Sequence, residues 1–516
     1  MKGSGGFHLP RLYKWEQQKV LGAFSLGSID HADLSQWSFG DEFLCFAIQT
    51  KFFEFADKSF PNPREKNEVP IWFLISCQLI LRLLGDGRYD HLHKLMNSGA
   101  VLSRVGYNIG STSIGFNQKN KNHRKTAVHP DTVRKYFKDT KPSELREWYN
   151  EDVQRWFRGQ RAFDTKGLFI LDQTHLVVPD NPNYKDAVKM PVDAFGQRYP
   201  NYNVLTLEAK HALTHHPCYT MSCLLHIGLG DSFHIAGYEL GPGNEDELPQ
   251  AKKLLPTFCK SHPGLMQELI VDRGYVDGDF VGSLKTDLDV DVLVPLKKNM
   301  DSYIDSVEIA TRENKWEILE EEKKSESGQM IKRQQAVLIE EIDLWESCSV
   351  KQFATVVKQT EWDDEESKYH EHIWVLGSTK KYSSPGAVIA RYGLRTQIEE
   401  RYRQFKHGGW MVGKFPSPHE SLIESHVCFS MLTYSLLQLY LRREDLKDQN
   451  RRFMETLKHE EQLGKNAVLI YAKDSFAILD LDDCMIRTLD LTGEAKEKVK
   501  NVLERQKEAR LRRTTF

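Results

Sequence analysis

The sequence predicts an α/β protein in which a mixed β-sheet is flanked by helices. From Gly167 onward, short apolar runs of the kind that form buried strands follow one another, and turn residues separate them. Segments with helical periodicity alternate with the later runs, an order typical of a mixed sheet covered by helices. The chain before about residue 150 lacks such runs and has mainly helical patterns. We therefore expect a helical N-terminal region followed by the sheet.

Composition indicates a globular chain of several domains. The 516 residues are 40% hydrophobic and 28% charged, and at about 150 residues per domain they suggest roughly three domains. The eight cysteines are spread along the chain, which favours reduced thiols in a cytoplasmic protein over a disulfide framework. The N-terminus lacks the apolar core of a signal peptide. The longest apolar run, Val69 to Leu84, contains Gln78 and Arg82, so we expect a buried helix and no membrane partner.

The charge is unevenly distributed. A net charge of −3 does not indicate a nucleic-acid partner, but phosphate is bound by local patches rather than by total charge. The C-terminal segment RQKEARLRRTTF is basic, whereas residues 301–371 have more acids than bases. A second basic patch consists of Lys119, Lys121, Arg124, Lys125, Arg134, Lys135, Lys138 and Lys141, opposed only by Asp131 and Asp139.

Part of this basic patch is predicted to be helical. After a Gly/Ser/Asn-rich loop at Asn108 to Asn122, the segment AVHPDTVRKYFKD has Asp131 as a candidate N-cap. Its apolar residues fall at helical spacing, so the basic ones face outward. The pattern resembles the second helix of a helix-turn-helix, and the alternative is a basic surface helix without a DNA role. The candidate DNA-binding residues are Arg134, Lys135 and Lys138.

Five strands are predicted for the sheet. They carry the sequences LFILD, CYTMSCLLHIGLG, SFHIAGYELG, QELIVDRGY and VDVLVPLKK. Helices are expected at Glu245 to Cys259 and near Asp279 to Thr286. A β-rich insertion with the runs QQAVLIEEI, QFATVVKQT and HIWVLGST follows the fifth strand, and a long buried helix begins at SLIESHVCF.

These patterns divide the chain into five segments. They are a helical N-terminal DNA-binding region (1–160), the first part of the sheet-containing core (165–299), the β-rich insertion (300–375), the second part of the core (376–445) and a C-terminal tail (446–516). Whether the tail dimerises the protein is left open by the sequence.

Two aspartates occupy equivalent places in the predicted sheet. Asp172 closes the apolar run LFIL, and Asp272 closes ELIV. Functional groups in open α/β sheets gather beyond strand ends. Carboxylates brought together there can share hard cations such as Mg²⁺, and a two-metal site holds its ions about 3.5–4 Å apart around a transferring phosphate.

A helix supplies a third carboxylate. In RYGLRTQIEERYRQFKHGG, one helix face carries Tyr392, Arg395, Glu399 and Lys406, which fall within an arc of about 60° at about 100° per residue. Glu400 points about 100° away from Glu399 and is expected to be solvated or to form a salt bridge. Cations beside a carboxylate suit phosphoryl transfer on a polyanion, and the alternative is a salt-bridged surface helix.

These residues resemble those of a known family. The spacing Tyr392-x2-Arg395-x3-Glu399-x6-Lys406 is similar to the Tyr-Arg-Glu-Lys signature of bacterial insertion-sequence transposases of the DDE class. ILDQTHL and VDRGY resemble the segments that carry the first and second aspartates of that family, and the resemblance covers roughly residues 165–445. It implies an RNase H-like catalytic core, in which Asp172, Asp272 and Glu399 ligate Mg²⁺, with Mn²⁺ as a substitute ion.

The resemblance also implies partners and a reaction. Cut-and-paste transposition would act on double-stranded DNA, both the inverted-repeat ends of the element and the target, in a self-associated synaptic complex in the bacterial cytoplasm near the nucleoid. Tyr392, Arg395 and Lys406 would grip the terminal phosphates. Some members of this branch hold a flipped base against an insertion tryptophan. The candidates are Trp316, Trp345, Trp362 and Trp374.

Other interpretations are weighed against this one. Cys218 and Cys223, flanked by His211, His215, His216 and His226, lack the second matched ligand pair of a structural zinc site. Two roles remain open for Arg273, which could contact phosphate or could hold Asp272 in place. A transposase-derived DNA-binding protein without cleavage activity and an RNase H-like nuclease or resolvase are the competing functions. The three carboxylates disfavour the first alternative, and the Tyr-Arg-Glu-Lys spacing disfavours the second.

Overall fold

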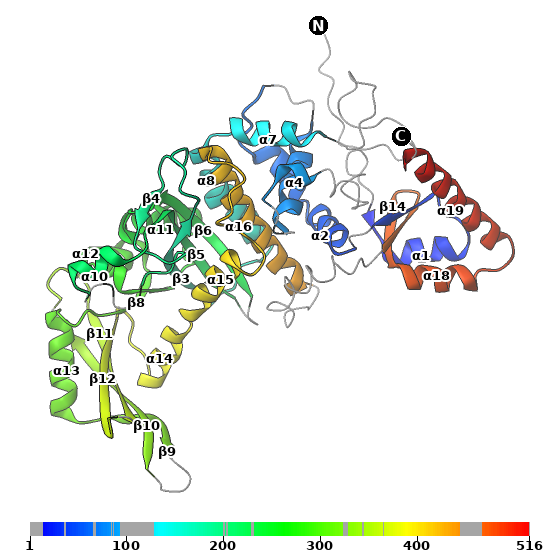
Figure 1. Ribbon diagram of the computed structural model, residues 1–516. Coiled ribbons are helices and arrows are strands. Elements are labelled where there is room, and N and C mark those ends of the chain that lie inside the picture. The colour runs from blue at the N-terminus through cyan, green and yellow to red at the C-terminus, as the bar shows by residue number, and fades with distance from the viewer. Residues whose placement is uncertain are drawn as a thin grey trace. The chain divides into compact units, whose positions relative to one another are not determined.

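The structure, a computed structural model, divides into two compact units. One unit comprises Met1–Tyr149 with Phe405–Phe516, and the other comprises Asn150–Gln404. Figure 1 labels their elements. No described helix is both long enough and apolar enough to span a bilayer. The structure describes residues 14–35, 38–65, 69–83, 85, 87–92, 128–199, 202, 205–228, 232–323, 329–342, 345–364, 366–443 and 467–514. The loop predicted at 108–122 and the basic residues from Lys119 to Lys125 lie outside them.

The second unit is built on a ten-stranded sheet. Its strand order is β4-β5-β3-β7-β8-β12-β11-β10-β9, and β6 pairs with β5 off this path. The strands are β3 (Leu168–Val177), β4 (Val188–Met190), β5 (His216–Ile227), β6 (Phe233–Pro242), β7 (Glu268–Val271), β8 (Asp291–Pro295), β9 (Glu317–Lys323), β10 (Met330–Ile342), β11 (Gln352–Asp363) and β12 (Lys368–Ser378).

The five predicted strands form one half of this sheet. They lie in the order β6-β5-β3-β7-β8, in which β5 is antiparallel to β3 and β6, while β3, β7 and β8 are parallel. Each connection between successive parallel strands contains a helix, as is usual for crossover connections. The predicted mixed sheet flanked by helices is therefore confirmed, and its arrangement is RNase H-like.

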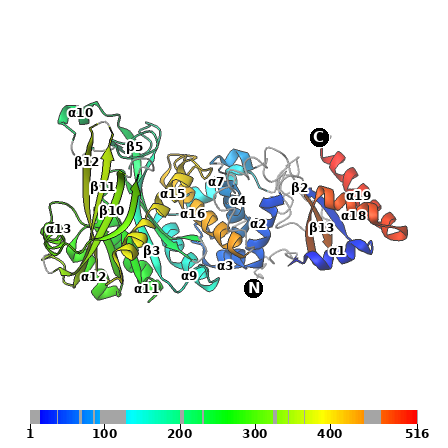
Figure 2. The same ribbon diagram turned by 90° about the horizontal axis from the view of Figure 1, so that it is seen from below.

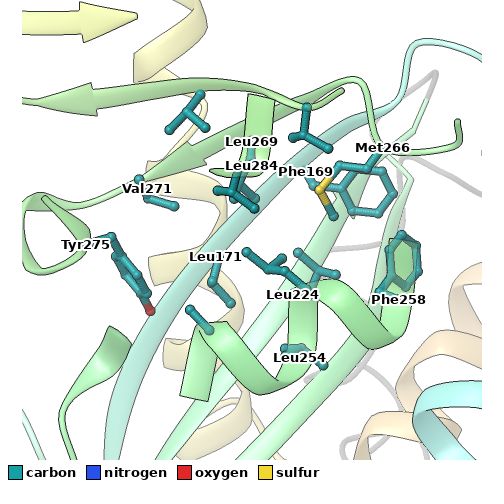
Figure 3. Close-up of a cluster of buried hydrophobic side chains, with 14 of the residues drawn as sticks. Phe169, Leu171, Leu224, Leu254, Phe258, Met266, Leu269, Val271, Tyr275 and Leu284 are labelled. Carbon is teal, nitrogen blue, oxygen red and sulfur yellow. The ribbon is translucent and has the colours of Figure 1, made fainter. Parts of the chain in front are cut away.

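Two helices cover one face of these strands. They are α11 (Glu247–Ser261) and α12 (Gly278–Leu288), close to the predicted bounds. Asp277 caps α12 by accepting a hydrogen bond from the Phe280 N–H at 2.7 Å, as its place before the helix predicts. Figure 3 shows Leu254 and Phe258 of α11 against Leu224 and Phe169 of the sheet. This apolar core fixes the strands that carry the two aspartates.

The insertion is β-rich, as predicted, but it continues the main sheet. Its last strand, β12, pairs antiparallel with β8, so that Gly377 lies opposite Val294. The insertion also contains a helix that the sequence analysis did not identify, α13 (Asp301–Glu313). Buried Tyr303 and Ala310 of α13 pack in one apolar cluster with residues of β10, β11 and β12, and Figure 2 shows the helix beside these strands. The insertion therefore has a core of its own.

Four further α-helices belong to the second unit. The helix that carries Glu399 is preceded by another, and the two are separated at Leu394 and Arg395. The four are α9 (Gln154–Gly159), α10 (Leu207–Ala212), α14 (Pro385–Gly393) and α15 (Thr396–Lys406), the last of which ends two residues beyond this unit.

The first unit contains helices around α16 (Glu420–Arg443), which is almost wholly buried, as predicted. The buried carboxylate of Glu424 pairs with Arg146 at 2.5 Å, a geometry that compensates its desolvation. The other helices of this group come from the N-terminal region, which was predicted to be mainly helical. They are α2 (Ser38–Gln49), α3 (Phe52–Ser59), α4 (Ile71–Leu83), α7 (Pro130–Asp139) and α8 (Pro142–Glu147).

The two ends of the chain share a small sheet, which the sequence analysis did not predict. The strand order is β1-β14-β13-β2, in which N-terminal β1 and β2 flank the C-terminal hairpin. An apolar cluster that includes Val20, Ile470 and Val499 lies between this sheet and its helices. The elements are β1 (Lys14–Trp15), β2 (His31–Ser35), β13 (Ala467–Ala472), β14 (Ser475–Asp480), α1 (Gln17–Ser25), α18 (Leu481–Asp490) and α19 (Gly493–Thr514).

Candidate active site

The two aspartates are brought together by strand register. In the parallel pair of β3 and β7, the last register partners are Leu171 and Val271, and the next residue on each chain is Asp172 or Asp272. Neighbouring strands lie about 4.8 Å apart, so the two carboxylates start from adjacent backbone positions. One prediction was wrong: β3 does not end at Asp172 but continues to Val177, because β5 keeps pairing with it after β7 has ended.

The third carboxylate lies in the first turn of α15. The sequence analysis placed Tyr392, Arg395 and Glu399 on one continuous helix, and this was wrong. Tyr392 is in α14, and Arg395 lies in the turn before α15. Tight i to i+3 hydrogen bonds replace the helical pattern there: the Arg395 N–H donates to the Tyr392 carbonyl at 2.9 Å, and the Ile398 N–H donates to the Arg395 carbonyl at 3.1 Å. This turn still directs Arg395 towards Glu399.

The three carboxylates converge on the Arg395 guanidinium. Its Nη1 lies 3.8 Å from Oδ2 of Asp172 and 3.8 Å from Oδ2 of Asp272. Its Nη2 lies 2.6 Å from Oε1 of Glu399. The Tyr392 ring centroid is 6.0 Å from the guanidinium carbon. Asp172 and Asp272 are 100 residues apart in the chain, and Asp272 and Glu399 are 127 residues apart. The three carboxylates nevertheless surround one cation.

Comparison with protein families identifies this segment. Residues 163–436, more than half of the chain, match the transposase DDE domain family. The chain belongs to this family of DDE transposases. None of the curated proteins compared with it matches. Among solved structures, it is similar to a piggyBac transposase in a synaptic complex with hairpin DNA, with 10% sequence identity, 96% of this chain and 85% of that chain covered, and a TM-score of 0.37.

The carboxylate chemistry of this DDE transposase fits divalent metal ions, which the family uses. Carboxylate oxygens are preferred ligands of hard cations, and here three of them surround a positive charge. The ligand atoms of Asp172, Asp272 and Glu399 do not all lie within 4.8 Å of one another; among the described residues, only Asp363, Glu366 and His370 form such a group. That second group lies on the β11–β12 hairpin, where Asp363 is half-buried and the other two residues are exposed, and the Lys368 ammonium also pairs with Glu366.

Burial strongly perturbs one carboxyl of the transposase. The side chain of Asp172 is 15% exposed, and burial raises its pKa to about 7, against the lowering effect of Arg395 and with a further increase from Asp272. One of its oxygens accepts a hydrogen bond from the Gln173 N–H at 2.9 Å. Burial also raises the pKa of Tyr392 to about 12. Near neutral pH, the Asp172 carboxyl is therefore partly protonated, whereas the Tyr392 phenol is fully protonated.

Two residues near the transposase carboxylates were missed by the sequence analysis. Tyr402 of α15 is buried, and its phenol reaches the backbone of Asp172. The sequence feature that could have identified Tyr402 is its position three residues after Glu399, on the same side of the helix. Glu247 begins α11 and pairs with Arg198 at 3.5 Å. Burial raises the pKa of Glu247, which also interacts with the charge of Asp272. A Cβ atom on Gly274 would lie 1.3 Å from a Glu247 oxygen, so a larger residue there would require the Glu247 side chain to move.

The remaining predicted residues are placed as follows. Glu400 forms a salt bridge with Arg403 at 2.7 Å, as expected of a neighbour outside the site, and its hydrogen bond with Arg403 lowers its pKa to about 2. Lys406 is the last residue of α15 and belongs to the other compact unit. Arg273 is exposed. The four insertion tryptophans, Trp316, Trp345, Trp362 and Trp374, are all partly buried.

The basic helix of the transposase, α7, is amphipathic as predicted. Val133, Tyr136 and Phe137 are buried, while Arg134, Lys135 and Lys138 are exposed. The predicted cap was wrong. His129 precedes the helix and accepts a hydrogen bond from the Asp131 N–H, because Pro130 at the first helical position moves the start two residues earlier. Asp131 instead pairs with Arg134 at 3.0 Å.

Proposed function

We propose that this DDE transposase binds the ends of a transposable element and cleaves and joins DNA with two divalent metal ions. Asp172, Asp272 and Glu399 would hold the ions, with Mg²⁺ as the physiological ion and Mn²⁺ as its substitute. The observation that carries the proposal is the convergence of these three carboxylates on one cation, with contacts of 2.6 to 3.8 Å. Such a set of hard oxygen donors is suited to Mg²⁺.

Each residue has a distinct role in this proposal. Bound divalent ions supply Lewis-acid activation of the attacking hydroxyl and stabilise charge on the transferring phosphate. Asp172 must lose its proton before it can act as a ligand, so its raised pKa couples ion binding to pH. Arg395 is positioned to neutralise the carboxylates or a DNA phosphate. Tyr392, beside Arg395, and Lys406 complete the proposed contacts with the terminal phosphates.

The DNA partner is proposed from family membership and from the exposed basic face of α7. Arg134, Lys135 and Lys138 present positive charge opposite the buried side of this helix, which is the arrangement needed to contact a phosphate backbone. Double-stranded transposon ends and target DNA would be the substrates, and two copies of the chain would pair the two ends. The Tyr392, Arg395, Glu399 and Lys406 spacing supports a place among bacterial insertion-sequence transposases.

Metal-dependent nicking of the inverted repeats that flank the coding sequence tests this proposal. Asp172→Ala, Asp272→Ala and Glu399→Ala are each expected to abolish cleavage and leave end binding largely intact. Glu400→Ala is the matched control, because Glu400 is the adjacent carboxylate and pairs with Arg403 instead. It should cleave like the wild type.

Two results would contradict parts of the proposal. Cleavage that survives Glu399→Ala but is lost in Glu400→Ala would move the third ligand by one residue. A wild-type chain that binds the ends tightly but never nicks them, with Mg²⁺ or with Mn²⁺, would instead indicate a transposase-derived DNA-binding protein.

A further inference from the structure

The buried phenol of Tyr402 joins the Glu399 helix to the Asp172 strand. Tyr402 lies three residues after Glu399 on α15 and is 6% exposed. Its hydroxyl donates a hydrogen bond to the Asp172 carbonyl and accepts one from the Cys223 N–H at 3.2 Å. One side chain of α15 thus contacts the backbones of β3 and β5 at the same level of the sheet.

The two backbone groups bound by Tyr402 belong to register partners. Asp172 of β3 lies directly opposite Cys223 of β5 in the antiparallel pair. The phenol oxygen therefore reaches the strand pair at the residue that carries a site carboxylate. Because side chains alternate between sheet faces, Asp172 and Cys223 point away from the face on which Leu171 and Leu224 pack against α11.

We propose that Tyr402 is a positioning residue, which fixes the distance between the Asp172 and Glu399 carboxylates and thereby sets the affinity of the site for divalent metal ions. The inference rests on the proposed function. Glu399 is one helical turn from Tyr402, so a shift of α15 relative to β3 moves its carboxylate by a similar amount. Such outer partners orient metal ligands without touching the metal.

The chemistry of the contact requires a hydroxyl as well as a ring. Phenylalanine would fill the same volume but could neither donate to the Asp172 carbonyl nor accept from the Cys223 amide. The hydroxyl does both at once, because it donates to Asp172 and accepts from Cys223. Apolar and cationic contacts of α15 remain in such a variant, including buried Ile398 and Arg401, whose guanidinium carbon lies 4.0 Å from the Phe233 ring centroid.

Tyr402→Phe in the full-length chain tests this role against Tyr303→Phe. Tyr303 also donates its phenolic hydrogen bond to a backbone carbonyl, that of Ile373 at 2.9 Å, in the same compact unit but within the insertion. Mn²⁺ binding without DNA is measured by calorimetry, and end cleavage is measured across a Mg²⁺ titration. Tyr402→Phe should weaken Mn²⁺ binding and raise the half-maximal Mg²⁺ concentration, each about 10-fold. At saturating Mg²⁺ its cleavage should approach the wild-type rate.

The control variant separates positioning from general stability. Tyr303→Phe is expected to lower the melting temperature by a similar amount and to keep the wild-type metal response. If the two variants have the same Mn²⁺ affinity and the same half-maximal Mg²⁺ concentration, Tyr402 has no positioning role. Cleavage by the wild type would still support the proposed function in that case. A wild-type chain that binds no Mn²⁺ and cleaves no ends would overturn both. If Tyr402→Phe does not fold, Tyr402→Gln, whose shorter side chain would hold α15 and β3 at a different distance, must bind Mn²⁺ more weakly than Tyr303→Phe for the inference to stand.

Discussion

The guanidinium of Arg395, just before α15, and the carboxylate of Glu399 in its first turn form a salt bridge of 2.6 Å, and the same guanidinium lies 3.8 Å from Asp172 and from Asp272. A single positive charge thus faces three acidic groups. This arrangement limits the repulsion between carboxylates when they are ionised. It also places a protein cation where the proposed metal ions would be attracted.

Removal of the Arg395 charge should therefore tighten metal binding. For Arg395→Ala without DNA, we expect Mn²⁺ affinity at pH 8.5 to rise several-fold, because a cation that competes for the same carboxylates is lost. End binding should weaken, and the slope of its salt dependence should fall by roughly 1, since one phosphate contact disappears. Calorimetry with Mn²⁺ and end-binding titrations at several salt concentrations measure the two effects.

Arg403→Ala provides the control for Arg395→Ala. Arg403 lies on the same helix and pairs with Glu400 at 2.7 Å, so its removal takes away a charge without exposing the three carboxylates. Its Mn²⁺ affinity should match that of the wild type. If Arg395→Ala binds Mn²⁺ more weakly than the wild type, Arg395 organises the ligands rather than competing for them.

Metal binding should depend on pH through Asp172. Its pKa is raised to about 7, mainly by burial, and a protonated carboxyl is a poor metal ligand. Mn²⁺ affinity should increase by up to about tenfold per pH unit as the pH rises towards 7 and level off above it. The groups that face Asp172 are Arg395, Asp272, Glu247 and the Gln173 N–H. Calorimetry between pH 5.5 and 9 measures the effect, and an affinity that stays flat from pH 6 to 8 would contradict it.

The sequence was sufficient for the features that depend on local patterns. Apolar runs identified β3, β5, β6, β7 and β8, and the parallel pairing of β3 with β7 then placed Asp172 beside Asp272. The buried α16 was visible from its long, largely apolar sequence, and the amphipathic α7 was visible because its apolar residues repeat at helical spacing. Both aspartates and Glu399 could therefore be selected before any geometry was known.

Features that depend on contacts distant in the chain could not be predicted. The pairing of β12 with β8 joins the insertion to the main sheet, and β13 pairs with β2 across more than 400 residues. Neither pairing leaves a local signature. The phenol of Tyr402 meets Asp172 only after folding, over a separation of 230 residues. The interruption of the helix at Leu394 and Arg395 was missed, because the spacing of residues in the sequence is the same whether or not a tight turn separates two helices.

The lysines of α7 provide a prediction about DNA binding. The double variant Lys135→Ala/Lys138→Ala should weaken end binding several-fold and reduce the salt slope by roughly 2, because both ammonium groups are exposed. Arg134 should contribute less, since it already pairs with Asp131 at 3.0 Å. Lys496→Ala/Lys500→Ala removes two exposed charges from α19 in the same compact unit. An equal loss in this control would mean that α7 acts only through total charge.

Replacement of Asp172 should stabilise the metal-free protein while it abolishes cleavage. The pKa of Asp172 rises from 3.8 to about 7 on folding, so this group lowers the free energy of unfolding progressively as the pH rises through that interval. Asp172→Asn removes the buried charge and keeps an acceptor for the Gln173 N–H. With chelator present, its unfolding free energy should exceed that of the wild type by roughly 2–4 kcal/mol at pH 8 and by less at pH 5. Asp186→Asn at an exposed site should change neither value. A gain for Asp172→Asn that is equally large at pH 5 and pH 8 would show that the stability difference comes from packing rather than from a buried ionised carboxylate.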